Sequence, residues 1–146
     1  MNPIKTGLKK KIKVLIVDDS LVFRERLARG LAQDSGIEVV GTAPNAYVAR
    51  DKIIKLRPDV MTLDVEMPGM SGIEFLRRLM PQYPIPVVVV SAVSENVFDA
   101  LNAGAVDFIT KPDLRKQISS DFFINELIVK IKIASTAKVG HWKKDI

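Results

Sequence analysis

The sequence has 146 residues, of which 47% are hydrophobic and 27% are charged, with a net charge of +5 at pH 7. This length suits one domain, and no apolar stretch approaches the roughly 20 residues that a bilayer-spanning helix needs. There is no cysteine, which excludes disulfides and thiolate metal sites. Because the first residues lack the apolar segment of a secretory signal, we expect a cytoplasmic protein without a membrane span.

Much of the positive charge lies near the two ends of the chain, in the stretches LKKKIK and HWKKDI. Basic ends are more often solvated tails than nucleic-acid-binding arms, and no pattern of interleaved aromatic residues suggests stacking on bases. We therefore expect no nucleic-acid partner. The predicted organisation is a basic tail over residues 1–11, one domain over residues 12–134, and a tail or linker stub over residues 135–146.

Strand-like and helix-like segments alternate along the predicted domain. Short β-branched or apolar runs predict strands at 13–17, 38–43, 59–63, 86–90 and 106–110. Apolar residues at helical spacing predict helices at 20–33, 45–56, 71–80, 95–103 and 121–134. We expect Ser20 to cap the first helix, Pro58 to follow the end of the second, and Gly104 to end the fourth.

The strict alternation of strands and helices favours an α/β fold. Helical crossovers between parallel strands place helices on both faces of the sheet. The continuous apolar run at 86–90 is typical of a strand that is buried on both faces. We therefore predict a doubly wound five-stranded parallel sheet in the flavodoxin-like order 2-1-3-4-5, with five flanking helices.

Polar residues follow or end four of the predicted strands. Asp18 and Asp19 follow the first strand, Asp64 the third, Ser91 the fourth and Lys111 the fifth. In the predicted order these strand ends meet at one edge, where open α/β sheets bind ligands. Three close carboxylates repel one another, and Mg²⁺, with Mn²⁺ as an alternative, would relieve that repulsion. Since a carboxylate can attack phosphorus while a lysine and a hydroxyl stabilise phosphoryl oxygens, the set indicates a self-phosphorylating acceptor.

The motifs VDDS, LDVEMPGMSGIEFL, VVVVSA and GAVDFITKP together resemble the receiver domain of two-component response regulators. The resemblance covers residues 12–134 and implies that Asp64 is the phosphoacceptor and the site of phosphorylation. It also implies that Asp19 ligates Mg²⁺ directly and that Asp18 does so largely through water. The backbone carbonyl of Glu66 would complete the metal shell.

The same resemblance implies roles for residues further along the chain. Ser91 matches the switch serine or threonine of the family, and Lys111 matches its invariant lysine. The Lys111–Pro112 peptide bond matches a position that is usually cis. Phe108 matches the aromatic switch position, which is often tyrosine in relatives. Because phenylalanine has no hydroxyl, only the rotameric part of that switch is expected here.

A longer stretch, TAPNAYVARDKIIKLRPDVMTLDVEMPGMSGIEFLRRLM, is similar to the receiver of the chemotaxis protein-glutamate methylesterases. In that family the receiver covers an esterase domain, and phosphorylation by the chemotaxis histidine kinase relieves the inhibition. The resemblance implies a histidine kinase as phosphodonor and, as target, an effector domain or the chemotaxis receptor apparatus. The chain contains no G-x-S-x-G nucleophile motif, and its single histidine, His141, lies near the end. We therefore expect it to catalyse only its own phosphorylation and dephosphorylation, with methylesterase activity confined to a longer protein.

Two other functions are alternatives at this point. A phosphate-independent interaction module would keep the fold without using the acidic set, although the set is intact. A nucleotide-binding or hydrolytic α/β enzyme is disfavoured, because the first turn, VDDSLVF, has neither G-x-G-x-x-G nor a P-loop to cradle phosphates. The segment Asp64-Val65-Glu66 resembles the D-x-D of aspartate-nucleophile phosphatases only weakly, and no insertion supplies a substrate cap.

Overall fold

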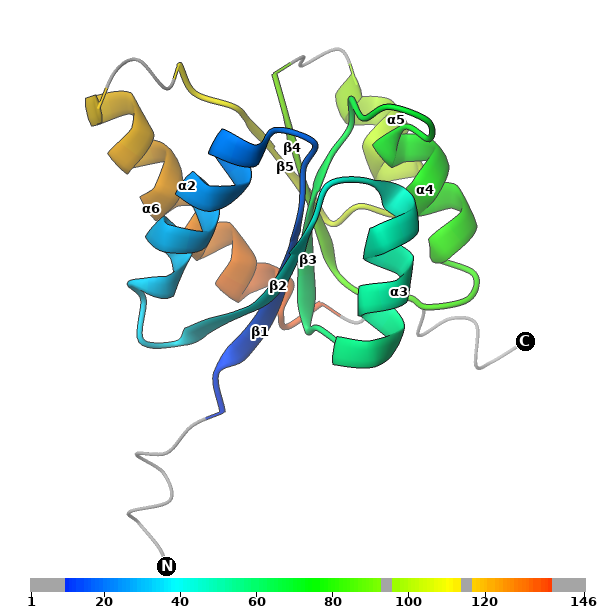
Figure 1. The fold of residues 1–146 in the computed structure, drawn as a ribbon, viewed down its shortest axis with the longest axis horizontal. Helices are drawn as coiled ribbons and strands as arrows, with labels where there is room; N and C mark the ends of the chain where they lie inside the picture. Colours follow the sequence, from blue (N-terminus) through cyan, green and yellow to red (C-terminus); the bar gives the residue numbers. More distant parts are fainter. Residues whose placement is uncertain (1–9, 93–95, 114–116, 138–146) are drawn as a thin grey trace, which may run out of the picture.

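Five strands and five helices alternate in the computed structural model, which describes residues 10–92, 96–113 and 117–137 (Figure 1). The strands are β1 (Ile12–Val17), β2 (Ile37–Ala43), β3 (Val60–Asp64), β4 (Val87–Ser91) and β5 (Asp107–Thr110). The helices are α2 (Leu21–Ala32), α3 (Ala46–Leu56), α4 (Gly72–Leu79), α5 (Val97–Asn102) and α6 (Gln117–Ala134).

The five strands form one parallel sheet in the order β2-β1-β3-β4-β5. This arrangement confirms the predicted α/β architecture and strand order. Strand β3 lies between β1 and β4, so the strand that ends in Asp64 is central in the sheet. All five residues of β4 are buried, as expected for a continuous apolar strand between two layers of helices.

Helices cover both faces of the sheet (Figure 1). Helices α2 and α6 lie on one face, and α3, α4 and α5 lie on the other. Successive residues of a strand point to opposite faces, so each strand contributes to two cores. In β1, Val14 and Ile16 belong to the core that also contains Leu127 of α6, whereas Leu15 and Val17 belong to the opposite core.

Side-chain caps fix where three of the helices begin. The hydroxyl of Ser20 accepts a hydrogen bond from the backbone N–H of Phe23 at 3.2 Å, which confirms the predicted cap of α2. Asn45 and Ser71 cap α3 and α4 in the same way. At the end of α3, Arg57 has a left-handed conformation with a φ of 48°, which turns the chain ahead of Pro58.

Three details differ from the sequence prediction. Helix α6 begins at Gln117 rather than at 121, because its first turn, QISS, lacks the apolar spacing that marks the rest of the helix. Helix α5 is shorter than the predicted 95–103, of which residue 95 lies outside the described residues. The Lys111–Pro112 bond is trans, since no peptide bond between described residues is cis. The expected cis bond was therefore wrong for this structure, which has the isomer that X–Pro bonds intrinsically prefer.

Within the described ranges, no helix combines the length and the hydropathy that crossing a membrane requires. Strand β1 begins at Ile12 and helix α6 ends at Ala134. Most of the predicted tails lie outside the described residues, so the domain boundaries at 12 and 134 stay predictions.

Candidate functional site

Strand register brings the predicted site residues to one edge of the sheet. Val17 pairs with Leu63, so the residues that follow them, Asp18 and Asp64, lie side by side where β1 and β3 end. Across the next pair of strands, Asp64 is opposite Val90, the residue before Ser91. At the far side of β4, the backbone N–H of Lys111 donates to the carbonyl of Ser91 at 2.9 Å. The carboxyl ends of four strands thus form the site.

Three carboxylates converge at this edge. Asp18 and Asp64 are buried, with only 1% and 3% of their surface exposed, whereas Asp19 is exposed to solvent. One carboxylate oxygen from each of the three residues lies within 4.8 Å of the other two. An all-oxygen set that is open to water on one side is the ligand environment that Mg²⁺ prefers. The residues present therefore fit a divalent hard cation.

Hydrogen bonds fix the backbone and one carboxylate oxygen of Asp18. Its backbone N–H donates to the carbonyl of Ala43 at 3.0 Å, and its Oδ1 accepts from the backbone N–H of Ser20 at 2.9 Å. The guanidinium of Arg24 donates to the Asp18 carbonyl at 2.7 Å. Sequence reasoning missed Arg24, because an arginine one turn into a helix carries no pattern that distinguishes it from a solvated charge.

Lys111 is the cation of the site. Its Nζ lies 2.9 Å from Oδ2 of Asp18 and 3.5 Å from Oδ2 of Asp64. The ammonium also lies 4.6 Å from the centre of the Phe23 ring, within the range of a cation–π interaction. Phe23 is itself buried and packs against Phe123 of α6 at a centroid distance of 5.8 Å. Helical spacing in the sequence can predict that Phe23 faces the core, but it does not show that the ring also contacts the lysine.

The surroundings of Asp64 raise the pKa of its carboxyl from 3.8 to about 7. Burial is the largest cause, because it disfavours the charged form, and the neighbouring negative charge of Asp18 is the next. A hydrogen bond with Asp19 also raises the pKa. The ammonium of Lys111 and the backbone N–H of Glu66, which donates to Oδ1 of Asp64 at 3.3 Å, act in the opposite direction.

Close packing of Gly72 against the backbone fixes the position of Asp64. Gly72, the first residue of α4, donates from its backbone N–H to the carbonyl of Val65 at 2.7 Å. A β-carbon at Gly72 would lie 2.2 Å from the carbonyl oxygen of Asp64 and 2.9 Å from the α-carbon of Val65. No side chain fits there without moving the backbone that carries Asp64. The sequence showed this glycine only as part of the loop and helix start.

The remaining predicted residues lie around this centre. Ser91 is fully buried at the end of β4, beside the strand that carries Asp64. Glu66 is exposed two residues after Asp64, and the metal-binding role of its carbonyl stays a prediction. Phe108 is half-buried in β5 and packs on the core beneath α3, α4 and α5. The structure therefore unites Asp18, Asp64 and Lys111 in direct contact and leaves the switching role of Phe108 a prediction.

Comparison with known proteins agrees with this geometry. Residues 14–121 match the family model of the response regulator receiver domain. The chain is 69% identical over 131 residues to protein-glutamate methylesterase/protein-glutamine glutaminase 2 of Syntrophomonas wolfei, covering 90% of this chain and 38% of that protein. It is 56% identical over 140 residues to protein-glutamate methylesterase/protein-glutamine glutaminase of Syntrophotalea carbinolica, covering 92% and 39% respectively. The chain thus spans less than two-fifths of the length of these two relatives.

A solved structure also has the fold of this chain. The response regulator domain of Thermotoga maritima CheB superposes with a TM-score of 0.80 at 37% identity, covering 88% of this chain and 99% of that domain. The region matched by the family model contains the three carboxylates, Ser91 and Lys111 at the strand ends described above. The chain therefore belongs to the response regulator receiver domains of two-component signalling, and among them to the type found in the chemotaxis methylesterases.

Proposed function

We propose that this chain accepts a phosphoryl group on Asp64 from the phosphohistidine of a histidine kinase, in a reaction that depends on Mg²⁺. One observation carries the proposal: Asp64 is buried beside Asp18, with the ammonium of Lys111 within 3.5 Å of both carboxylates. Phosphoryl transfer to a carboxylate requires a nucleophile, an adjacent positive charge and a set of metal ligands, and this site contains all three kinds of group.

In the proposed step, a carboxylate oxygen of Asp64 forms a bond to phosphorus while the bond from phosphorus to the histidine nitrogen breaks. The imidazole nitrogen keeps the electron pair and takes up a proton. Asp18, Asp19 and Asp64 would hold Mg²⁺, which would neutralise charge on the phosphoryl oxygens. Lys111 supplies a second positive charge at the same point, and its contact with Asp64 is the one that a phosphoryl oxygen would take over.

A related structure supports the proposal that the site binds Mg²⁺ and a phosphoryl group. The crystal structure of the CheX–CheY–BeF3–Mg²⁺ complex from Borrelia burgdorferi superposes with a TM-score of 0.70 at 28% identity, covering 91% of this chain and 95% of that one. That complex contains Mg²⁺ and a beryllofluoride group. By this analogy, the carboxylates at the ends of β1 and β3 would hold Mg²⁺ here, with Mn²⁺ as an alternative metal.

The phosphorylated state would act through Ser91 and the surface made by α5, β5 and α6. Ser91 is buried next to Asp64, so its hydroxyl would move to a phosphoryl oxygen, and Phe108 would follow by changing rotamer. The two helices of this surface carry exposed large apolar side chains, including Phe98 of α5 at 81% and Phe122 of α6 at 72%. A shift in the population of two arrangements would change how this surface binds an effector.

The effector that we propose is a methylesterase domain or the chemotaxis receptor apparatus. The relatives named protein-glutamate methylesterase/protein-glutamine glutaminase are more than twice as long as the region they share with this chain. Esterase activity would belong to the rest of such a protein, since the 146 residues contain no nucleophile motif of that class. Because a histidine kinase of this kind would draw on cellular ATP, we propose that the reaction takes place in the cytoplasm.

Intact-mass spectrometry after incubation with acetyl phosphate and Mg²⁺ tests the proposal. The native chain should gain one phosphoryl group, and Asp64→Asn should gain none. Asp51→Asn, the same change at an exposed residue of α3, is the matched control and should label like the native chain. Labelling of Asp64→Asn, or no labelling of the native chain, would overturn the proposal. The second result would favour a phosphate-independent binding module.

A further inference from the structure

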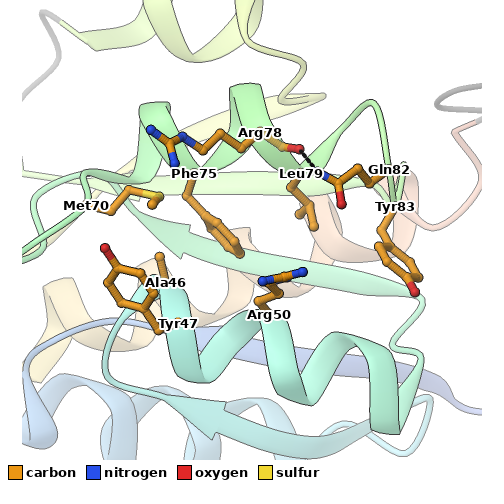
Figure 2. A pocket seen from close by; sticks show the side chains of 9 residues that line it. All are labelled: Ala46, Tyr47, Arg50, Met70, Phe75, Arg78, Leu79, Gln82 and Tyr83. Carbon is orange, nitrogen blue, oxygen red and sulfur yellow. Dashed lines mark hydrogen bonds between the residues drawn. The ribbon is translucent and has the colours of Figure 1, made fainter.

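A groove lies between α3 and α4, two helices on the face of the sheet opposite α2 and α6 (Figure 1). It encloses about 240 Å³, and none of the site residues at the strand ends lines it. Its floor consists of buried apolar side chains: Ala46 of α3, with Phe75 and Leu79 of α4. Figure 2 shows Phe75 and Leu79 pointing from α4 toward α3. The groove is therefore a surface feature separate from the proposed phosphorylation site.

Two tyrosines stand at the ends of the groove. Tyr47 at one end is 61% exposed, and Tyr83 at the other is 42% exposed (Figure 2). Exposed aromatic rings beside a buried apolar floor are the residue types that concentrate binding energy in protein interfaces. The volume is below the roughly 300–1,000 Å³ of pockets for cofactors and drug-sized ligands. This size fits one or two side chains of a partner better than a nucleotide.

The charge of the groove is positive. Arg50 and Arg78 line it, and no acidic side chain does. Arg50 is exposed and has no ion pair or hydrogen bond within the part of the chain that the structure describes. Arg78 donates from Nε to Glu74 at 2.8 Å, but the side chains of this pair are 65% and 44% exposed, respectively. Such a surface pair contributes little to stability, so a ligand carboxylate can readily compete for Arg78.

We propose that the α3–α4 groove is a docking site for an acidic segment of a partner protein, which places one large apolar side chain on the groove floor. The planar guanidinium groups of Arg50 and Arg78 would bind carboxylates on either side of that anchor, each with two parallel hydrogen bonds. The floor and the tyrosines would bury the anchor. The proposal does not depend on phosphoryl transfer, because the residues of that site are not part of the groove.

The probe for a test is a short end-capped peptide with one phenylalanine flanked on both sides by aspartate and glutamate. Binding is followed by fluorescence anisotropy and mapped by backbone amide chemical shifts. We expect shifts concentrated at the groove floor and at Tyr47. Peptides with alanine in place of phenylalanine, or with lysine in place of the acids, should bind at least about tenfold more weakly.

Charge-reversal variants make the test specific. Arg50→Glu and Arg78→Glu should each weaken binding by about tenfold or more. Arg77→Glu is the matched control, because Arg77 is an exposed residue of the same helix that does not line the groove. It should change the affinity by less than about threefold. Asp64→Asn should bind the peptide normally, which separates this proposal from the proposed function.

Four results would overturn the proposal. Binding of none of the peptides, or an equal loss in Arg77→Glu, would show that the groove recognises no acidic segment. Chemical shifts concentrated on the α5–β5–α6 surface would place the binding elsewhere. Concentration-dependent dimers in sedimentation that Arg50→Glu abolishes would assign the groove to a second copy of this chain.

Discussion

The charge of Asp64 should destabilise the metal-free protein, and its removal should stabilise it. The folded-state pKa of about 7 lies above the ordinary value of 3.8, so between these values the folded chain holds a proton that the unfolded chain has released. Stability therefore falls as the pH rises from about 4 through 7 and stays low above that range. A difference of about three pKa units corresponds to up to about 4 kcal/mol at high pH.

Asp64→Asn keeps the shape of the side chain and cannot ionise, so it should escape this penalty. In urea denaturation with EDTA, we expect the variant to be more stable than the native chain by up to about 4 kcal/mol near pH 8, with the gain vanishing near pH 4. Asp51→Asn, at an exposed position of α3, should show no such pH-dependent gain. Excess Mg²⁺ should shrink the gain, because the cation favours the ionised carboxylates of the native site.

The reasoning would be refuted by a gain in stability that is the same near pH 4 and near pH 8. That result would mean that burial and Asp18 do not penalise the charge of Asp64. If Asp64→Asn were instead less stable than the native chain at high pH, the sign of the effect would be wrong. Lys111 would then stabilise the Asp64 charge by more than burial and Asp18 destabilise it.

Three further variants test the packing around the site. Phe23→Leu removes the ring next to the ammonium of Lys111, a contact worth about 0.5–2 kcal/mol. This variant should be labelled by acetyl phosphate about three- to tenfold more slowly than the native chain. An unchanged rate would exclude positioning of the lysine by the ring. Gly72→Ala forces the backbone of Asp64 to move. It should lower the free energy of unfolding in urea by about 1–3 kcal/mol and weaken Mg²⁺ binding in calorimetry. Native-like values for both quantities would contradict the expected clash. Thr62→Val removes a buried hydroxyl that has no hydrogen-bond partner within the described ranges. It should raise the free energy of unfolding by about 1 kcal/mol, and a loss of stability would show that the hydroxyl is bonded.

The sheet and the acidic set were predictable because they depend on local patterns. Apolar runs that end in Asp18, Asp64 or Ser91 can be read along the chain, and the strand order then brings those ends together. Ser20 was predictable as a cap because its hydroxyl bonds within its own helix turn. Such features need no knowledge of which helix packs on which.

The contacts that position the site were not predictable in the same way. Phe23 contacts Lys111, which is far away in the sequence, only because the fold brings the ring of this α2 residue next to the side chain of the lysine that follows β5. Gly72 matters because the start of α4 lies against the backbone of Asp64, a distance that no residue pattern encodes. The first turn of α6 was not predicted, because its residues do not show the helical spacing of apolar side chains that marks the rest of the helix. The structure nevertheless begins the helix at Gln117.

The most direct test of the central claim is to identify which residue carries the phosphoryl group. The native chain is incubated with a phosphorylated histidine kinase and Mg²⁺ and then reduced with borohydride, which converts an aspartyl phosphate to homoserine. Peptide mass spectrometry should find homoserine at position 64 alone, and none when EDTA replaces the metal. Homoserine at position 18 or 19, or a phosphorylated chain without homoserine at any position, would contradict the assignment of Asp64 as the nucleophile.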